Sequence, residues 1–365
     1  MYRRFKTIRG KMQDLKTRIY NLRFKDLNWN MLQYIQKKYK EDPMSFLEVD
    51  DFDARHITEK VTKFLKNYSK KSNTDGYVIG LSGGIDSSVS AALAVKAIGK
   101  ENVFGMLLPS KFTSKEHIED ALELANQLGI KTNNYKKVQE YFDITAQDTL
   151  EMAEISPEDP NYKLIIANNH ARERMKILRS KAKSLNYLVL GTTNMTEAWL
   201  GYATIAGDGY KGIDVEPLQM LPKTSEREYA KYLLIPEKII NKAPTAGLWE
   251  NQTDESEIGM SYENIDRIMA GFFISKKGFE DIEGPRVVNI DKLLTDKELK
   301  QIYCEGLSME DIVKANKTKA ISKKSIKNIL QRVEANAFKA RPEPYANLTK
   351  SFSIAYEELK KGGAI

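Results

Sequence analysis

The apolar residues of this chain follow two patterns, short continuous runs and stripes with a spacing of three or four. Continuous apolar runs are typical of buried strands, whereas the stripes are typical of amphipathic helices. The predicted strands are 77–81, 103–108 and 187–190, and the predicted helices include 57–68, 87–97 and 114–128. Strands that alternate with helices predict an α/β fold, a doubly wound parallel sheet with helices on both faces.

The segment after the first predicted strand reads Ser82-Gly83-Gly84-Ile85-Asp86-Ser87-Ser88. Two glycines at a strand-to-helix turn let backbone N–H groups approach a ligand closely, and the helix N-terminus adds free donors and partial positive charge. Three serine hydroxyls add side-chain donors, so the segment predicts a phosphate site. The carboxylate of Asp86 in the same turn is suited to hold Mg²⁺ on that phosphate. The alternative is a turn whose glycines serve tight packing alone.

The amino-acid composition limits the kinds of metal site and the cellular compartment that we expect. Cys304 is the only cysteine of 365 residues, which excludes an intramolecular disulfide and a cysteine-rich zinc site. The three histidines are widely spaced, which argues against a histidine-built metal site. The sequence has no apolar run of about 18 residues and no secretory signal, so we expect a cytoplasmic protein without a membrane span.

The positive charge is concentrated at the N-terminus. Residues 1–40 hold twelve Lys/Arg and two Asp, so they carry +10, whereas the whole chain carries +7 and the remainder therefore −3. We therefore expect no nucleic-acid partner for residues 41–365. Apolar spacing within the segment predicts basic amphipathic helices, and the favoured interpretation is an arm packed on its own domain or on a dimer mate. Membrane contact, a targeting signal and RNA contact are the less favoured alternatives.

Several later segments carry more polar groups than packing requires. On a helix, Asn168, Arg172 and Met175 share one face, where a forked guanidinium suits a phosphate or carboxylate. The other segments are Leu190-Gly191-Thr192-Thr193-Asn194 with Glu197, Gly207-Asp208-Gly209, Lys223-Thr224, Lys242-Ala243-Pro244-Thr245 and 252–266. Together with the Ser-Gly-Gly-x-Asp-Ser loop, and in this order, they resemble the ammonia-dependent NAD synthetases of the ATP-pyrophosphatase superfamily. The resemblance covers about 57–270 and continues more weakly to the C-terminus.

This resemblance implies a Rossmann-like fold of the adenine nucleotide alpha-hydrolase type and a homodimer. It implies that ATP adenylates the carboxylate of nicotinic acid adenine dinucleotide, releasing pyrophosphate, and that ammonia then displaces AMP to give NAD. By position, the implied ATP-binding residues are Gly80, Ser82, Gly83, Gly84, Asp86, Ser87, Ser88, Thr192, Lys223 and Thr245. The implied Mg²⁺ ligands are Asp86 and Glu197, and the implied dinucleotide contacts are Arg172 and Asp214. Asp86 and Lys223 are expected to be catalytic, and Asp208 to orient or deprotonate ammonium.

Two departures from the family bear on the acid that is amidated. Ile205 stands where the family usually has a substrate-contacting lysine, and Tyr210-Lys211 look inserted nearby. We expect Lys211 to restore the missing cation; alternatively, the dinucleotide is held differently or the acid is another one. Near the C-terminus the family's histidine is replaced by Phe338, whereas Lys339 keeps a cation for substrate binding.

The expected organisation has three parts: a basic helical extension (1–50), an ATP-pyrophosphatase-type domain (51–275) and a C-terminal helical region that completes the substrate site (276–365). A fused glutamine-hydrolysing domain needs a nucleophilic cysteine, and the residues before 57 contain none. We therefore expect a ligase that uses free ammonia, or ammonia from a separate glutaminase. The alternatives are the same chemistry on another acid, such as nicotinic acid mononucleotide, a non-catalytic nucleotide-binding protein, and a tRNA-modifying pyrophosphatase.

Overall fold

The computed structural model describes residues 47–209, 211–245, 247, 252–274, 323–336 and 339. Most of the predicted extension (1–50) and most of the predicted C-terminal region (276–365) lie outside these described residues. The three predicted parts and their boundaries therefore stay predictions.

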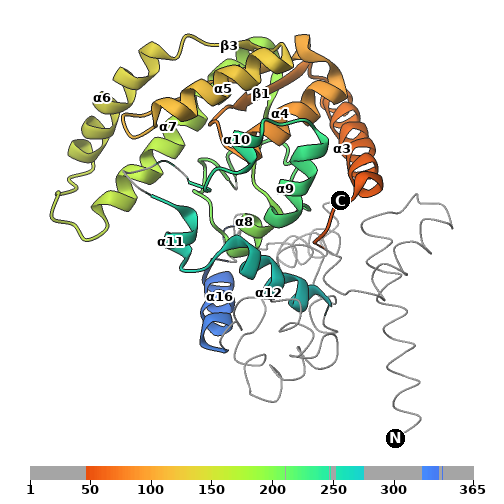
Figure 1. Cartoon of the computed structure of the whole chain (residues 1–365). Coiled ribbons are helices and arrows are strands. Elements are labelled where there is room, and N and C mark those ends of the chain that lie inside the picture. The colour runs from red at the N-terminus through yellow and green to blue at the C-terminus, as the bar shows by residue number, and fades with distance from the viewer. Residues whose placement is uncertain are drawn as a thin grey trace, which may run out of the picture.

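A parallel four-stranded sheet forms the centre of the described structure (Figure 1). Its strands are β1 (Gly76–Gly80), β2 (Val103–Met106), β3 (Lys131–Thr132) and β4 (Tyr187–Leu190), in the order β3-β2-β1-β4. All three strand pairs are parallel, which confirms the predicted α/β fold. Only β3 was not predicted, because two residues are too few to produce a periodic signal.

The helices lie between and around the strands. They are α3 (Asp51–Lys71), α4 (Ile85–Ile98), α5 (Lys115–Leu128), α6 (Lys136–Met152), α7 (Tyr162–Leu185), α8 (Met195–Leu200), α9 (Lys223–Tyr232), α10 (Glu237–Ile240), α11 (Asp254–Ile258), α12 (Tyr262–Ile274) and α16 (Lys323–Asn336). Helix α5 agrees with the prediction, and Ser114 caps it by accepting a hydrogen bond from the His117 N–H at 3.3 Å. Helix α4 begins two residues earlier than predicted, which brings Asp86 into its first turn.

The two faces of the sheet bury two different sets of side chains. Along β1, Tyr77 and Ile79 pack with residues of α3, α4, α5 and α9, whereas Val78 packs with residues of α6 and α7. This alternation follows from the two-residue period of a strand, and it explains why β1 reads as a continuous apolar run. Because β1 and β4 are neighbours and parallel, their C-terminal ends lie at the same edge of the sheet.

Within the described ranges, we find no helix with both the length and the apolar character to cross a membrane.

Candidate active site

The loop between β1 and α4 is built for close contact with an anion. Gly83 has a φ of +78°, and a Cβ at this position would lie 2.2 Å from the carbonyl oxygen of His117. Any other residue would therefore be strained and would also displace the backbone. Ser87 donates to the Gly84 carbonyl at 3.1 Å, and its Oγ lies 3.1 Å from the Ser82 Oγ. These contacts fix the turn that presents the N-terminus of α4.

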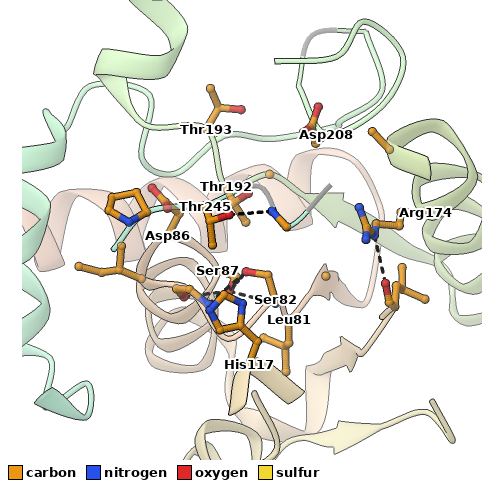
Figure 2. A pocket seen from close by; sticks show the side chains of 18 of the residues that line it. Leu81, Ser82, Asp86, Ser87, His117, Arg174, Thr192, Thr193, Asp208 and Thr245 are labelled. Atoms are coloured by element: carbon orange, nitrogen blue, oxygen red, sulfur yellow. Dashed lines mark hydrogen bonds between the residues drawn. The ribbon is translucent and has the colours of Figure 1, made fainter. Parts of the chain in front are cut away.

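This loop forms one end of a pocket of about 270 Å³ at the C-terminal ends of the strands. The other walls come from the ends of β2 and β4, from α7, from residues 202–208, and from Lys223 and Thr245. Figure 2 shows Ser82, Ser87 and Asp86 at one end of the pocket, while Arg174 and Asp208 lie toward the other. A ligand of open α/β sheets binds in such a position, outside the carboxyl ends of the strands.

Three carboxyl groups surround the ammonium of Lys223. It forms an ion pair with Asp86, and it lies 3.6 Å from Glu226 Oε2 and 4.0 Å from Glu197 Oε1. The lysine is only 1% exposed. Burial alone would raise the pKa of Asp86, but the Lys223 ammonium outweighs it and holds the pKa of Asp86 below its usual range. Burial, together with the charge on Asp86, raises the pKa of Glu197 well above its usual range.

A capping box at the start of α8 positions two of the polar groups. The Asn194 side chain accepts a hydrogen bond from the Glu197 N–H at 2.9 Å, and Glu197 Oε2 accepts one from the Asn194 N–H at 3.3 Å. The amide nitrogen of Asn194 in turn donates to Asp86 Oδ1 at 2.8 Å. The local sequence Asn-Met-Thr-Glu thus holds the side chain of Glu197 in place, and Asn194 connects it to Asp86.

A buried carboxylate fixes the backbone that carries Lys223. Asp266 is buried in α12, accepts a hydrogen bond from the hydroxyl of Thr196, and accepts another from the Thr224 N–H at 2.7 Å. The Lys223 N–H donates to Thr196 Oγ1 at 3.0 Å. Helices α8, α9 and α12 therefore meet at one hydrogen-bonded point, so Lys223 enters the pocket from a fixed backbone position.

The far end of the pocket holds an arginine and a loop carboxylate. Arg174 Nε donates to the Leu108 carbonyl at 3.0 Å, and its guanidinium lies 5.6 Å from the Phe142 ring centre. Burial lowers the pKa of Arg174, and the charge of Asp208 opposes this effect. Asp208 Oδ1 accepts a hydrogen bond from the Thr204 N–H at 2.7 Å, which folds the loop that carries it.

The structure brings together most of the residues that the sequence singled out. Those that line the pocket are Gly80, Ser82, Gly84, Asp86, Ser87, Thr192, Glu197, Asp208, Lys223 and Thr245. Gly83 and Ser88 belong to the same loop but do not line it: Gly83 packs against His117, and Ser88 is fully buried and donates to the Gly84 carbonyl at 2.7 Å.

Four predicted substrate contacts lie elsewhere. Asp214 forms a two-pronged ion pair with Arg179 at 2.6 and 2.7 Å and accepts a hydrogen bond from the Val189 N–H at 2.8 Å, so it braces the sheet edge. Arg172 and Lys211 are exposed and do not line the pocket. Lys339 lies next to the pocket and donates to the carbonyls of Gly201 at 2.8 Å and of Ala203 at 3.1 Å.

Sequence reasoning missed several polar groups of the pocket, among them Arg174, Tyr202 and Asp254. Arg174 takes the place expected for Arg172, because residues two apart on a helix face different directions and Ala171, Arg174 and Met175 share the pocket face. Tyr202 and Asp254 also line the pocket, and burial raises the pKa of Asp254 to about 6. The Arg-x-Arg pattern contained the first signal; the structure places Arg174 in the pocket wall, and a substrate contact of Arg172 stays a prediction.

The donor set fits a magnesium ion held partly by its nucleotide. In the described part of the chain, no group of three or more acidic, histidine or cysteine side chains forms a metal site. Mg²⁺ commonly takes only one or two protein carboxylates, with water and substrate phosphates completing its coordination. Asp86 and Glu197 supply two such carboxylates at the phosphate end of the pocket, where a positive charge would relieve their mutual repulsion.

Comparison with known proteins agrees with this geometry. The family model described as NAD synthase matches residues 57–298, the region that holds the sheet and all the residues that line the pocket. The chain belongs to the NAD synthase family. Its fold is that of the NAD synthetases, and the chain is a ligase.

Two relatives within the NAD synthase family are aligned with this chain over most of their length. The NH(3)-dependent NAD(+) synthetase of Methanosarcina acetivorans is 35% identical over 297 residues, 81% of this chain and 99% of the relative. That of Methanococcus aeolicus is 42% identical over 229 residues, 63% of this chain and 87% of the relative.

Two solved structures show the same family fold. The NH3-dependent NAD synthetase from Campylobacter jejuni is 28% identical, with a TM-score of 0.56 over 80% of this chain and 99% of that one. A structure described as NMN synthetase from Francisella tularensis is 32% identical, with a TM-score of 0.55 over 74% of this chain and 99% of that one. Members with this fold therefore differ in the product for which they are named.

Proposed function

We propose that this chain converts nicotinic acid adenine dinucleotide to NAD, using ATP and free ammonia. One observation carries the proposal: the buried Lys223 pairs with Asp86 of the Ser82–Ser87 loop, in the pocket that also holds Glu197 and Asp208. This arrangement offers a cation and N–H groups for the phosphates of a nucleoside triphosphate, and carboxylates for its metal ion. The names of the relatives support the acid and the nitrogen source.

In the first step, a carboxylate oxygen of the acid attacks the α-phosphorus of ATP. The bond from that phosphorus to the bridging oxygen of the β-phosphate breaks, and pyrophosphate leaves with the electron pair. The N–H groups at the start of α4 and the hydroxyls of Ser82 and Ser87 bind the departing phosphates. Lys223 stabilises the negative charge that develops on them.

In the second step, ammonia attacks the carbonyl carbon of the adenylate and AMP leaves. Ammonium must lose a proton before it can attack. Asp208 is suited to bind ammonium and orient it, because its carboxylate lies on the pocket wall in a loop held by Thr204. We propose that the ammonia is free, or is delivered by a separate glutaminase.

Asp86 and Glu197 are the residues that would hold Mg²⁺. The ion supplies charge neutralisation on the phosphates when it is bound. The residues of this chain keep the two carboxylates ready for it through the Asn194 hydrogen bonds and the capping box of α8.

A second candidate reaction uses the same steps on nicotinic acid mononucleotide. Two observations favour it: the similarity to the structure described as NMN synthetase, and the position of Lys211 outside the pocket. The mononucleotide acid is smaller than the dinucleotide acid and would need fewer contacts with the protein around residues 205–211.

One assay separates these reactions. The full chain is incubated with ATP, Mg²⁺, ammonium chloride and each acid in turn, while pyrophosphate release and the amide product are followed. We expect NAD from the dinucleotide acid at a higher kcat/KM than nicotinamide mononucleotide from the mononucleotide acid. The reverse preference would replace the first reaction by the second. If neither acid leads to release of pyrophosphate, both reactions are rejected.

We also propose that the protein is a homodimer. Ile144 and Met152 on α6 and Leu164 at the start of α7 are 62%, 79% and 50% exposed, so two helices in contact with each other carry large apolar side chains at the surface. Light scattering after size-exclusion chromatography should give twice the chain mass. Ile144→Lys should shift the mass toward one chain, and an unchanged mass would place the dimer contact elsewhere.

A further inference from the structure

Lys242 is a cation of the pocket wall to which the proposed reaction gives no role. It stands three residues before Thr245, and the whole segment 242–245 lines the pocket. Its side chain is only 13% exposed, although lysines are rarely buried to this extent. Among the described residues that line the pocket, the other lysine and arginine are Lys223 and Arg174. A third cation in this wall therefore calls for an explanation.

The ammonium of Lys242 lies at the phosphate end of the pocket. It pairs with Asp120 and lies 3.7 Å from Glu116 Oε1, and these two residues of α5 stand on either side of His117. His117 packs directly against the phosphate loop, because a Cβ on Gly83 would lie 2.2 Å from the His117 carbonyl oxygen. Figure 2 shows His117 at the same end of the pocket as the serines of this loop. Burial lowers the pKa of His117, and the nearby charge of Lys242 lowers it further.

The ion pair with Asp120 does not by itself account for Lys242. Asp120 is buried, and it already pairs with Lys238 of α10 at 2.6 Å. One buried carboxylate is thus shared between two ammonium groups. Lys238 has a second partner in Glu123 at 2.7 Å, whereas the second partner of Lys242 is Glu116, which is 71% exposed and contributes little in water. The charge of Lys242 therefore remains available to an anion in the pocket.

We infer that Lys242 binds the β- and γ-phosphates of ATP, and the pyrophosphate formed from them, as a second cation in addition to Lys223. A phosphate chain carries several negative charges, and an ammonium group is a suitable point charge for it. Asp120 holds this ammonium at the pocket wall, so little side-chain freedom is left to lose when the phosphates bind. The inference rests on the proposed function for the presence of ATP in this pocket.

The test compares Lys242→Gln with a matched control, Lys238→Gln. Each substitution leaves Asp120 with one ammonium partner, but Lys238 is half exposed and does not line the pocket. Titration calorimetry of the full-length variants gives the Kd of Mg²⁺-ATP, of magnesium pyrophosphate and of AMP. We expect Lys242→Gln to raise the Kd of the first two ligands by roughly tenfold and to leave that of AMP unchanged. Lys238→Gln should match the wild type for all three, and Lys242→Arg, which keeps the charge, should recover part of the affinity.

Three other results would overturn the inference. An unchanged Kd of pyrophosphate in Lys242→Gln would make Lys242 a partner of Asp120 only. Equal losses in Lys242→Gln and Lys238→Gln would trace the effect to the contact between α5 and α10, and an equal loss for AMP would place the contact on another part of the nucleotide. Lys242→Met provides a second neutral variant and should weaken the same two ligands.

Calorimetry keeps this test separate from the proposed function. Wild-type protein that binds Mg²⁺-ATP but amidates neither acid would reject the proposed reaction, while the comparison of Lys242 with Lys238 still decides the inference.

Discussion

The side-chain amide of Asn194 donates a hydrogen bond of 2.8 Å to Asp86, which lies 108 residues earlier in the chain. The same side chain accepts a hydrogen bond from the Glu197 N–H at 2.9 Å. One amide at the end of β4 therefore orients the carboxylate at the end of β1 and starts the helix that carries the second carboxylate. Both carboxylates keep their positions because the parallel β1–β4 pair fixes the distance between their loops.

Asp86→Asn should abolish most of the activity without unfolding the protein. The substitution removes the charge that pairs with Lys223, but the lysine keeps Glu226 at 3.6 Å and Glu197 at 4.0 Å, so no ammonium is left alone in the interior. We expect pyrophosphate release to fall by roughly 10²–10³-fold, as for the loss of one preorganised electrostatic group.

The matched control for Asp86 is Asp75→Asn. Asp75 lies beyond the opposite end of β1, is exposed, and accepts a hydrogen bond from the Asn186 side chain at 2.9 Å. Its substitution should leave pyrophosphate release unchanged. Comparable losses in the two variants would contradict a specific role for Asp86.

Arg174 should matter more than Arg172 for the acid substrate. Arg174 lines the pocket, whereas Arg172 is exposed and has a 3.5 Å contact with Asn169. A hydrogen bond to a charged group contributes about 1.5–3 kcal/mol, so Arg174→Lys should raise the KM for the acid by roughly tenfold or more. Arg172→Lys should change it little. A larger effect at Arg172, measured with saturating ATP and ammonium, would return the substrate contact to that residue.

The choice between these arginines illustrates what the sequence could and could not supply. Asp86 and Glu197 were predictable because their positions depend on local structure, a strand-to-helix turn and a capping box, both readable from a few consecutive residues. The phase of a long helix depends on tertiary packing. A shift of two residues in α7 moves a side chain to a different face, and nothing local to the Arg-x-Arg pattern sets that phase.

Glu226 shows a second limit of sequence reasoning. A glutamate in an amphipathic helix with Lys231 and Glu228 nearby is normally interpreted as part of the solvated face. Its burial becomes visible only when α4 and α12 are packed against α9. The parallel sheet, by contrast, was predictable because its strands are buried on both faces and leave continuous apolar runs.

The stability of the protein should decrease as the pH rises from 5 to 8. Burial raises the pKa of Glu216 from 4.5 to about 7, although hydrogen bonds from Thr193 oppose the effect. The folded state therefore favours the protonated form. This preference of Glu216 for the proton adds to the free energy of unfolding. The contribution is complete below pH 4.5 and is lost as the pH rises through about 7. Asp254, with a pKa of about 6, acts in the same direction.

Thermal unfolding at constant ionic strength tests this dependence. The Tm of the wild type should fall between pH 5 and pH 8, and Glu216→Gln should show a smaller fall, because glutamine accepts the Thr193 hydrogen bond without titrating. The residual slope should then reflect Asp254. If wild type and Glu216→Gln lose stability equally over this range, Glu216 does not titrate as its burial implies.

Lys339 should influence the acid substrate by holding the loop that lines the pocket. Its ammonium donates to the carbonyls of Gly201 and Ala203, on either side of the pocket residue Tyr202. Arg332 of α16 lies 5.5 Å from the Tyr202 ring centre and supports the same segment. Lys339→Ala removes two hydrogen bonds to carbonyls, so the loop should become less ordered and the KM for the acid should rise, while the KM for ATP stays close to that of the wild type.

Lys211→Ala provides the comparison, because Lys211 carries the same charge on a neighbouring loop but lies outside the pocket. Its KM for the acid should equal the wild-type value. A rise for Lys211→Ala with no change for Lys339→Ala would mean that Lys211 moves to the substrate and supplies the cation missing at Ile205. An increased KM for the acid in both variants would mean that the loop with Lys211 closes over the acid. Lys211 would then contact the acid directly, and Lys339 would support the loop.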